Sequence, residues 1–279
     1  MTVSIIGIGL IGGSFALAVK DKGIAKKVIG VDSNEGHRQK ALELGLVDEL
    51  KELDEAVKAS DLIILAIPVD AVEKVLPSVL DKVDKQMVMD AGSTKAGILE
   101  SVKNHAKRGR FVATHPMWGT EYSGPEAAVH GAFEGKATVI CDKEESDKDA
   151  AELVENFYKQ LGMHLVYMDG KNHDVHVAYV SHISHITSFA LANTVLEKER
   201  EEDAIFELAS GGFESTVRLA KSNPLTWASI FMQNRENVLD VLNEHISQLR
   251  KFKACLEKEN YEYLEELMIN ANRIKRIIK

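Results

Sequence analysis

The stretch Thr2-Val3-Ser4-Ile5-Ile6-Gly7-Ile8-Gly9-Leu10-Ile11-Gly12 decides the fold of this chain. It begins with a short apolar run that predicts a buried β-strand and continues into glycines spaced G-x-G-x-x-G. Residues 14–19 follow with a helical pattern, and the apolar residues 28–31 predict a second strand that ends at Asp32, 20 residues after Gly12. A strand, a glycine-rich turn, a helix, a second strand and a terminal acid together predict a dinucleotide-binding unit.

Each position of this unit has a physical role. Gly7 permits the tight turn, Gly9 lets the backbone approach a pyrophosphate, and Gly12 lets the helix pack closely on the strand. The free N–H groups and the dipole of the helix N-terminus favour the diphosphate. Asp32 is expected to accept hydrogen bonds from ribose hydroxyls and to repel a 2′-phosphate, which predicts NAD; Arg38 is the nearby cation that would support NADP instead. The predicted cofactor contacts are Gly7, Ile8, Gly9, Leu10, Ile11, Gly12, Asp32, Ser33, Ile67, Pro68, Asp90 and Ser93.

The composition is that of an ordinary globular protein with room for two domains. Of 279 residues, 45% are hydrophobic and 28% charged, and the net charge of −9 argues against nucleic acid or an anionic membrane as the main partner. The two cysteines, Cys141 and Cys255, offer neither a disulfide framework nor a C-x-x-C site, so a reducing cytoplasm is predicted. The apolar N-terminus lacks a basic segment and no run reaches membrane-spanning length, so we predict neither a signal peptide nor a membrane helix.

Strands and helices alternate through the first part of the chain. After the glycine-rich unit, strands are predicted at residues 62–67, 86–89, 111–114, 137–140 and 164–167, and helices at 35–44, 54–59, 70–83 and 146–161. This alternation predicts an α/β, doubly wound, Rossmann-type nucleotide-binding domain over residues 1–169. Residues 170–279 contain only helical patterns, broken at 210–212 and 222–224, and predict an all-α domain for substrate binding and dimerisation. Residues 172–198 are expected to form its central buried helix, and residues 261–279 a closing helix.

Two polar segments each follow a predicted strand, at the sheet edge where α/β proteins bind ligands. The first is Asp90-Ala91-Gly92-Ser93-Thr94-Lys95, in which the alternative is that Ser93 or Thr94 only caps the next helix. The second is Thr114-His115-Pro116-Met117-Trp118-Gly119-Thr120-Glu121. Because an imidazole titrates near neutrality, His115 is the candidate general base, with Ser93 expected to hydrogen-bond its ring; the alternative is a loop histidine that only packs.

Two further clusters lie in the helical part. His173, Asp174 and His176 precede Ser181-His182-Ile183-Ser184-His185, whose two histidines share a helix face. A metal site there would lack a third ligand, so no metal is predicted, and the histidines are expected to face the cleft or to be satisfied in the core. Arg218, within an apolar run, is the candidate for binding a carboxylate, or is an exposed arginine paired with a nearby glutamate.

Taken in order, these segments resemble the prephenate dehydrogenase family over nearly the whole chain. The resemblance rests on Gly7 to Gly12, Asp90 to Lys95, His115 to Gly119, His173-Asp174, Ser181 to His185 and Gly211 to Trp227. It implies NAD-dependent oxidative decarboxylation of prephenate to 4-hydroxyphenylpyruvate. A homodimer formed through the helical domain is expected by analogy with other folds that place a helical domain after a nucleotide-binding domain.

The resemblance also implies residue roles. His115 would take the proton of the ring 4-hydroxyl, Ser93 would orient it, and Arg218 would bind the ring carboxylate. His185, near the substrate side chain, favours prephenate over arogenate, the alternative substrate. Further predicted substrate contacts are His182, Ser181, Gly211 and Trp227. Trp118 replaces a smaller residue of the family and is expected to reshape the pocket wall, and neither a fused mutase nor a regulatory domain is expected.

Two other functions stay open. A β-hydroxyacid dehydrogenase would share the two-domain layout, but it requires a lysine on the first long helix of the second domain, whereas Lys171 precedes that helix. A nucleotide-sensing module would bind a protein or DNA through its helical half, although the net charge and the lack of a basic stripe disfavour DNA.

Overall fold

The computed structural model describes residues 1–199 and 206–277 of the chain. It divides into two compact units, Met1–Asn234 and Arg235–Lys279, and each is described by itself. The predicted boundary between residues 169 and 170 lies within the first of these units, where the last strand is followed by the first helix of the helical part, and the predicted division into domains stays a prediction.

An eight-stranded sheet forms the centre of the first unit, with the order β3-β2-β1-β4-β5-β6-β7-β8. Every neighbouring pair is parallel except β6 and β7, which are antiparallel. The strands are β1 (Thr2–Ile6), β2 (Lys27–Val31), β3 (Glu49–Leu50), β4 (Leu62–Leu65), β5 (Met87–Asp90), β6 (Phe111–Pro116), β7 (Ala137–Cys141) and β8 (His164–Met168). The doubly wound, Rossmann-type fold predicted from the sequence is confirmed, since the chain leaves β1 first toward β2 and β3 and then returns to place β4 on its other side.

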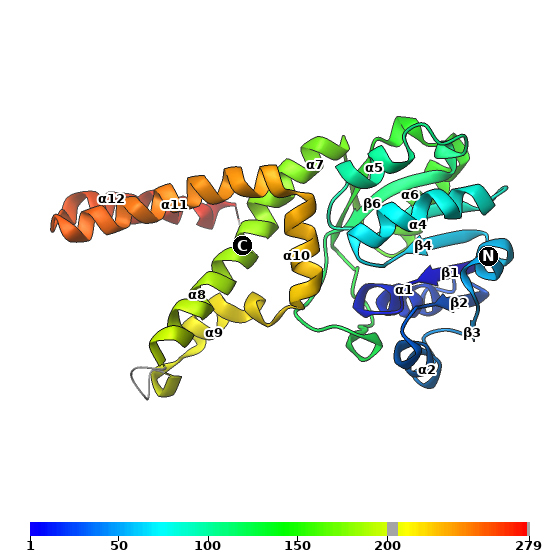
Figure 1. Ribbon diagram of the computed structural model, residues 1–279, viewed down its shortest axis with the longest axis horizontal. Coiled ribbons are helices and arrows are strands. Elements are labelled where there is room, and N and C mark those ends of the chain that lie inside the picture. The colour runs from blue at the N-terminus through cyan, green and yellow to red at the C-terminus, as the bar shows by residue number, and fades with distance from the viewer. Residues whose placement is uncertain (200–205, 278–279) are drawn as a thin grey trace. The chain divides into compact units, whose positions relative to one another are not determined.

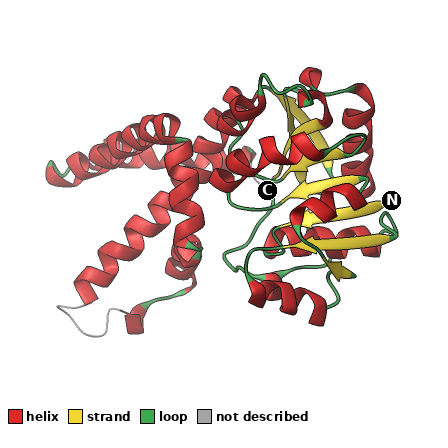
Figure 2. Cartoon of the chain, turned by 45° about the vertical axis from the view of Figure 1, so that its right-hand side comes forward, coloured by secondary structure: helices red, strands yellow, loops and turns green. Residues whose placement is uncertain are grey.

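Helices cover both faces of this sheet (Figure 2). They are α1 (Leu10–Asp21), α2 (Glu35–Glu43), α3 (Leu53–Ala59), α4 (Val69–Lys82), α5 (Ala96–Val102) and α6 (Lys148–Gln160). Successive side chains of a strand point to opposite faces, so Ile5 packs in the core with Phe15 of α1 and Phe157 of α6, whereas Ile6 packs in the core with Leu76 of α4. Two hydrophobic cores therefore fix the carboxyl ends of the parallel strands as one rigid edge.

The remainder of the first unit is helical (Figure 1). It comprises α7 (Gly170–Val177), a π-helical turn (Ala178–His182), α8 (Ile183–Glu199), α9 (Gly211–Val217), a 3-10 turn (Arg218–Lys221) and α10 (Pro224–Gln233). The breaks predicted at 210–212 and 222–224 are confirmed, because α9 and α10 begin there.

The expectation of a central buried helix over residues 172–198 is wrong in two respects. The π-helical turn divides it into α7 and α8, and in α8 only His185 and Ser188 are buried in the described chain. The apolar residues of α8 are spread around the helix rather than gathered in one stripe, so a single neighbouring surface cannot bury them all. Leu196, for example, remains half exposed.

The second unit consists of α11 (Arg235–Glu257), α12 (Tyr261–Ala271) and a 3-10 turn (Asn272–Arg276). Glu259 takes a left-handed conformation between the two helices, and the Asn260 side chain accepts a hydrogen bond from Tyr263 N to begin α12. The closing helix predicted over 261–279 ends earlier than expected, at Ala271, and residues 278–279 lie outside the described chain. No helix in the described ranges has the length and apolar character needed to cross a membrane.

Candidate active site

The glycine-rich turn after β1 has the shape that a dinucleotide requires. Gly7 has φ +93, and a Cβ there would lie 2.5 Å from the O atom of Ala66, the residue after β4, so a side chain is excluded. A Cβ at Gly12 would lie 1.9 Å from Gly7 O. Gly9, by contrast, faces open space, and no side chain caps the N-terminus of α1. The turn therefore leaves backbone N–H groups of a twelve-residue helix available for a diphosphate, so these residues fit the predicted cofactor.

Asp32 follows the last residue of β2 beside this turn. Its Oδ2 accepts a hydrogen bond from Ile8 N at 2.8 Å and its Oδ1 accepts one from Asn34 N at 2.8 Å. These bonds hold the carboxylate at the position where the fold places a ribose. Arg38, the cation that would support NADP, contacts Glu52 at 3.1 Å and Glu35 at 3.3 Å, so carboxylates already surround it.

Asp90 and Lys95 form a fully buried ion pair at the end of β5. Asp90 also accepts hydrogen bonds from Gly92 N at 2.8 Å and Thr114 N at 3.0 Å, and Lys95 Nζ donates to Thr114 O at 2.9 Å. Because both carboxylate oxygens are already engaged, this pair ties the segment after β5 to β6. A contact of Asp90 with the cofactor stays a prediction.

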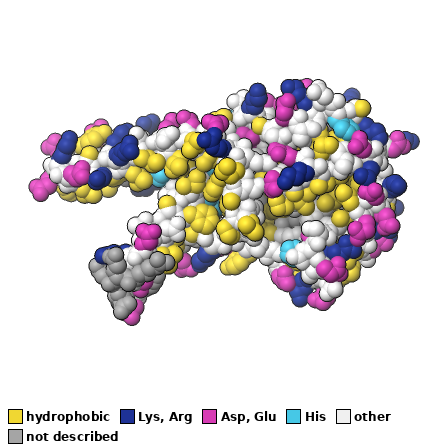
Figure 3. All heavy atoms as spheres, in the orientation of Figure 1, with side chains coloured by type: hydrophobic (Ala, Val, Ile, Leu, Met, Phe, Trp, Pro, Cys, Tyr) yellow, Lys and Arg dark blue, Asp and Glu magenta, His cyan; other side chains and the backbone are white. Residues whose placement is uncertain are grey.

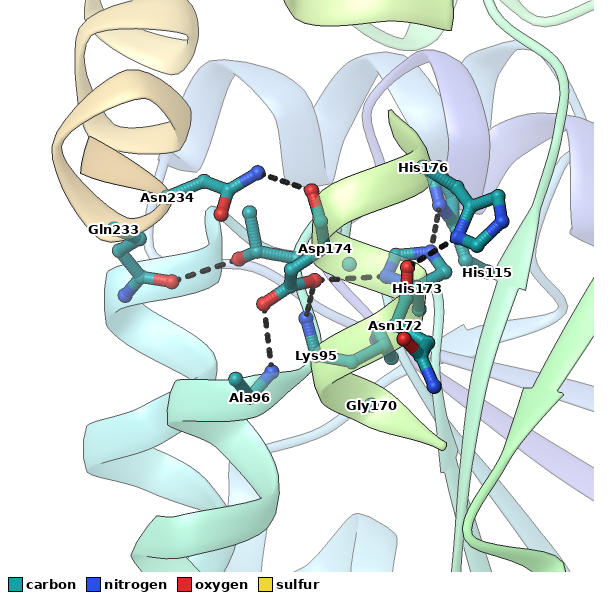
Figure 4. A network of polar contacts seen from close by, with 12 residues as sticks. Lys95, Ala96, His115, Gly170, Asn172, His173, Asp174, His176, Gln233 and Asn234 are labelled. Atoms are coloured by element: carbon teal, nitrogen blue, oxygen red, sulfur yellow. Dashed lines mark hydrogen bonds and ion pairs between the residues drawn. The ribbon is translucent and has the colours of Figure 1, made fainter. Parts of the chain in front are cut away.

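The alternative in which Ser93 or Thr94 caps the following helix is wrong. Helix α5 begins at Ala96, and its first N–H groups donate instead to Asp174 of α7, from Lys95 N at 2.7 Å and from Ala96 N at 2.9 Å. The Thr94 hydroxyl donates to Gln233 of α10 at 2.9 Å. The acceptor for the N–H groups at the start of α5 is therefore remote in the sequence, and Figure 4 shows Asp174 beside Lys95 and Ala96.

His115 lies within β6 and contacts His173 of α7, which in turn contacts Asp174 (Figure 4). Its Nδ1 is 2.8 Å from His173 Nε2, and His173 Nδ1 is 2.8 Å from Asp174 Oδ1. The structure shows no hydrogen bond between Ser93 and His115 in the described ranges, so the expected contact is replaced by one from His173, 58 positions along the chain. His115 Nε2 has no hydrogen-bond partner among the described residues.

The surroundings keep His115 neutral. Burial lowers the pKa of His115 well below 6.5, and the nearby His173, Lys95 and His182 lower it further. Burial also lowers the pKa of His173, although the hydrogen bond to Asp174 opposes this shift. A neutral imidazole with one free nitrogen can act as a general base.

A second group of rings comes from the π-helical turn, α8 and α10. The His185 ring stacks on Trp227 with centroids 3.3 Å apart, and His185 Nδ1 donates to Ser181 O at 3.1 Å. His182 lies edge-on to Trp227 and accepts a hydrogen bond from Asn234 Nδ2 at 3.2 Å. Burial lowers the pKa of His182 to about 4 and also lowers that of His185. His182, His185 and Trp227 are therefore brought together as a neutral aromatic group, and Ser181 contacts it through its backbone carbonyl.

Arg218 lies in the 3-10 turn after α9 rather than within an apolar helix, and its side chain is 49% exposed. Its Nη1 is 2.7 Å from Glu121 Oε2, in the segment that follows His115. The alternative of an exposed arginine paired with a glutamate describes this contact. Binding of a substrate carboxylate by Arg218 stays a prediction, as does the role of the exposed Gly211 at the start of α9.

The remaining predicted residues are placed as follows. Ile67 lies against Gly7, and the exposed Pro68 precedes α4. Ser33 is exposed after β2. The Trp118 ring packs edge-on against Phe133 beside the hydrophobic core, with centroids 5.6 Å apart. No three His, Cys, Asp or Glu side chains in the described ranges are arranged to hold a metal ion.

Two protein-family models together match nearly the whole chain. The family model "Prephenate dehydrogenase, nucleotide-binding domain" matches residues 15–167, and "Prephenate dehydrogenase, dimerization domain" matches residues 169–270. The chain belongs to the prephenate dehydrogenase family. The resemblance inferred from the sequence motifs is thereby confirmed, and a β-hydroxyacid dehydrogenase is set aside.

Individual members of the prephenate dehydrogenase family match over most of their length. The prephenate dehydrogenase of Bacillus subtilis is 31% identical over 94% of this chain and 72% of its own. The cyclohexadienyl dehydrogenase of Zymomonas mobilis is 27% identical over 99% of this chain and 96% of its own. A crystal structure of prephenate dehydrogenase from Aquifex aeolicus, in complex with hydroxyphenyl propionate and NAD+, superposes with a TM-score of 0.89 and 31% identity over 99% of this chain and 97% of that one.

The sequence motifs indicate His115 as the base of this prephenate dehydrogenase family member, but they do not indicate which residues hydrogen-bond to it. His173 and Asp174 stand out only as part of a histidine-rich segment, and Gln233 and Asn234 carry no signal of their own. The one sequence feature that points to them is that His173 and Asp174 are consecutive at the start of the helical part. Consecutive positions do not by themselves predict a contact with His115 on a strand.

Proposed function

We propose that this chain catalyses the NAD-dependent oxidative decarboxylation of prephenate to 4-hydroxyphenylpyruvate. The observation that carries the proposal is the position of His115 at the carboxyl end of β6. Parallel pairing through β4 and β5 puts this end at the same sheet edge as the glycine-rich turn after β1. A neutral base and a dinucleotide cradle at one edge are what oxidation of an alcohol by a nicotinamide requires.

In this proposal the residues Gly7 to Gly12 hold the diphosphate and Asp32 holds the ribose, and NAD, when bound, supplies the acceptor for the hydride that leaves the ring carbon. His115 Nε2 accepts the proton of the 4-hydroxyl on that carbon, so that positive charge does not build up on oxygen. The bond to the ring carboxylate then breaks, CO2 leaves, and its electron pair completes the aromatic ring. Aromatisation supplies the driving force, so the protein mainly positions the ring and takes the proton.

Arg218 is proposed to bind the ring carboxylate. Its half-exposed pair with Glu121 supports this role, because an exposed ion pair is held weakly and a substrate carboxylate can replace the glutamate. Ser93 is proposed to contact the substrate hydroxyl directly, since it does not hold His115. His185 is proposed to lie near the keto acid side chain, which favours prephenate over arogenate.

The test is a matrix of two substrates and two cofactors. Purified chain is mixed with prephenate or arogenate and with NAD or NADP, and the reduced nicotinamide is followed by absorbance. We expect turnover with prephenate and NAD. Faster turnover with arogenate would transfer the proposal to the amino acid substrate, and tight NAD binding without any turnover would instead support a nucleotide sensor.

We also propose two functional halves, residues 1–169 and 170–279, and a homodimer formed through the second. The separate matches to a nucleotide-binding and a dimerization domain support this division. Hydrophobic side chains gather over α10 (Figure 3), where Leu225 and Met232 are largely exposed. Sedimentation equilibrium tests the dimer, and a monomer at micromolar concentration contradicts it.

A cytoplasmic location is proposed as well, in keeping with free, buried Cys141 and Cys255.

A further inference from the structure

We propose that Asp174 and His173 act as a positioning pair that fixes the protonation of His115, with the proton on Nδ1 and the lone pair on Nε2. The inference rests on the proposed function, because it explains how the base of that reaction is prepared. It derives from the contacts that join α7, β6 and the start of α5 (Figure 4).

The position of the proton on each histidine is determined first by Asp174, which is 3% exposed. Its Oδ1 accepts from Lys95 N at 2.7 Å and its Oδ2 accepts from Ala96 N at 2.9 Å, and both donors are backbone groups that cannot act as acceptors. The carboxylate therefore acts only as an acceptor here. Since His173 Nδ1 is 2.8 Å from the same Oδ1, that nitrogen must carry the proton and donate it.

The tautomer of His173 in turn determines the tautomer of His115. It is fully buried, and burial lowers its pKa, so it carries a single proton, the one on Nδ1. Its Nε2 is then an acceptor, and at 2.8 Å the His115 Nδ1 must be the donor. His115 is left with an unprotonated Nε2, which is the nitrogen that has no partner in the described chain. The reverse tautomer would place a proton on Nε2 and remove the base.

The pair also supports the charge that forms during proton transfer. When His115 Nε2 accepts a proton, the positive imidazolium donates through Nδ1 to His173, which is polarised by the carboxylate of Asp174. Lys95, itself paired with Asp90, and His182 face His115 from other elements and oppose that charge. The directions of these hydrogen bonds therefore favour the Nδ1-protonated tautomer of His115, which can act as a base, over the Nε2-protonated tautomer, which cannot.

The first experiment measures the tautomer directly and needs no turnover. The chain labelled with 15N-histidine is studied by NMR near neutral pH, and His115 is assigned by loss of its signals in His115→Asn. We expect an Nδ1-protonated ring. A proton on His115 Nε2 in the native chain would overturn the proposal.

The second experiment uses three variants. His173→Phe keeps a ring but removes both nitrogens, and His173→Gln restores an acceptor near the position of Nε2. His176→Phe is the matched control, because His176 lies on α7, is exposed, and contacts Asn172 O of its own helix. We expect His173→Phe to lower kcat about 10- to 100-fold with little change in the KM of prephenate, the magnitude found when the hydrogen-bond partner that orients a metal-bound histidine is lost.

His173→Gln should recover part of that loss, and His176→Phe should match the native chain in kcat and in the His115 tautomer. Equal activity of His173→Phe and His176→Phe would overturn the positioning role, as would equal losses in the Phe and Gln variants. If the native chain does not turn over prephenate or arogenate while His115 shows the expected tautomer, the proposed function fails and the hydrogen-bond order stands. Should His173→Phe not fold, the tautomer of the native chain still decides.

Discussion

At the scale of single residues, His115 is the group on which turnover should depend most. We expect His115→Asn to lower kcat by about 10²- to 10⁴-fold, the usual contribution of general base catalysis, because the amide cannot accept the hydroxyl proton. NAD binding should change less than about twofold, since the cradle lies on β1 and α1. Steady-state kinetics and NAD titration check this, with the exposed His164→Asn on β8 as control. Undiminished kcat in His115→Asn would remove the histidine from the reaction.

The pH dependence of the reaction should reflect the environment of His115. A base works only when neutral, and burial lowers the pKa of His115 well below 6.5. The rate should therefore be fully present at pH 6.5 and should decline only as the pH falls through the lowered pKa. The acidic limb of kcat/KM measures this. A limb centred at or above pH 6.5 would contradict the predicted environment.

Arg218 should affect substrate binding more than stability. The ion pair with Glu121 involves a side chain that is 49% exposed, so its loss should change the free energy of unfolding by only about 0–1 kcal/mol. Arg218→Gln is expected to raise the KM of prephenate at least about tenfold, because a charge-assisted carboxylate contact is lost. Lys221→Gln, an exposed cation in the same turn, serves as the control. An unchanged KM would show that the arginine has a structural role only.

The residue types of the site can be predicted, but their partners cannot. The glycine spacing and the histidine after a strand are local patterns, and both are visible in the sequence. The contact of His115 with His173 depends on how α7 returns across the end of β6, which no local pattern specifies. Ser93 is the partner that the order of strands favours, yet adjacency of strands does not determine where a short side chain points.

At the scale of secondary-structure elements, the start of α5 depends on Asp174. Asp174→Ala would leave Lys95 N, Ala96 N and His173 Nδ1 without their acceptor in a buried place. We expect a loss of about 3 kcal/mol in the free energy of unfolding. Asp169→Ala is the matched comparison, since Asp169 caps α7 through Asn172 N at an exposed site, where the loss should be about 1 kcal/mol. Urea unfolding of both variants would contradict this if the two losses were equal.

Most elements can be predicted because their signals are local. Buried strands such as β4 are continuous apolar runs, and the turn before α1 has its glycines. The two-residue β3 is missed because so short a strand has no periodicity. The π-helical turn is missed because it shifts the helical periodicity by a single residue, which cannot be seen in a segment whose apolar residues form no clear stripe.

At the scale of the whole molecule, acid should destabilise the unit Met1–Asn234. His115, His173, His182 and His185 all have a lowered pKa in the folded state, so the unfolded chain binds protons more readily. Stability is therefore fully present above about pH 6.5 and is lost as the pH falls toward the folded values. For His182, with a pKa of about 4, the loss amounts to about 3 kcal/mol. Urea unfolding at about pH 7.5, 6 and 5 measures it, and a constant free energy over this range would contradict the prediction.

The fold class, the family and the passage from α/β to helical structure can all be predicted at this scale, because each depends on the order of elements along the chain. The exposure of α8 cannot be predicted in the same way. An apolar helix has the same sequence pattern whether its neighbours come from its own chain or from another copy.

The π-helical turn between α7 and α8 requires a fixed number of residues between the two helices as well as particular residue types. His182 follows Asp174 by eight positions, which in a regular α-helix would leave it about 80° beyond two full turns. The surplus residue of the turn offsets most of this angle, and Asn234 Nδ2 accordingly reaches both Asp174 O, at 2.6 Å, and His182 Nδ1, at 3.2 Å. Deletion of one residue within Ala178–His182 would rotate His185 on α8 away from its present position relative to His173 and Asp174 on α7, even with every other side chain retained. Insertions and deletions there should accordingly be tolerated less than substitutions at the same positions.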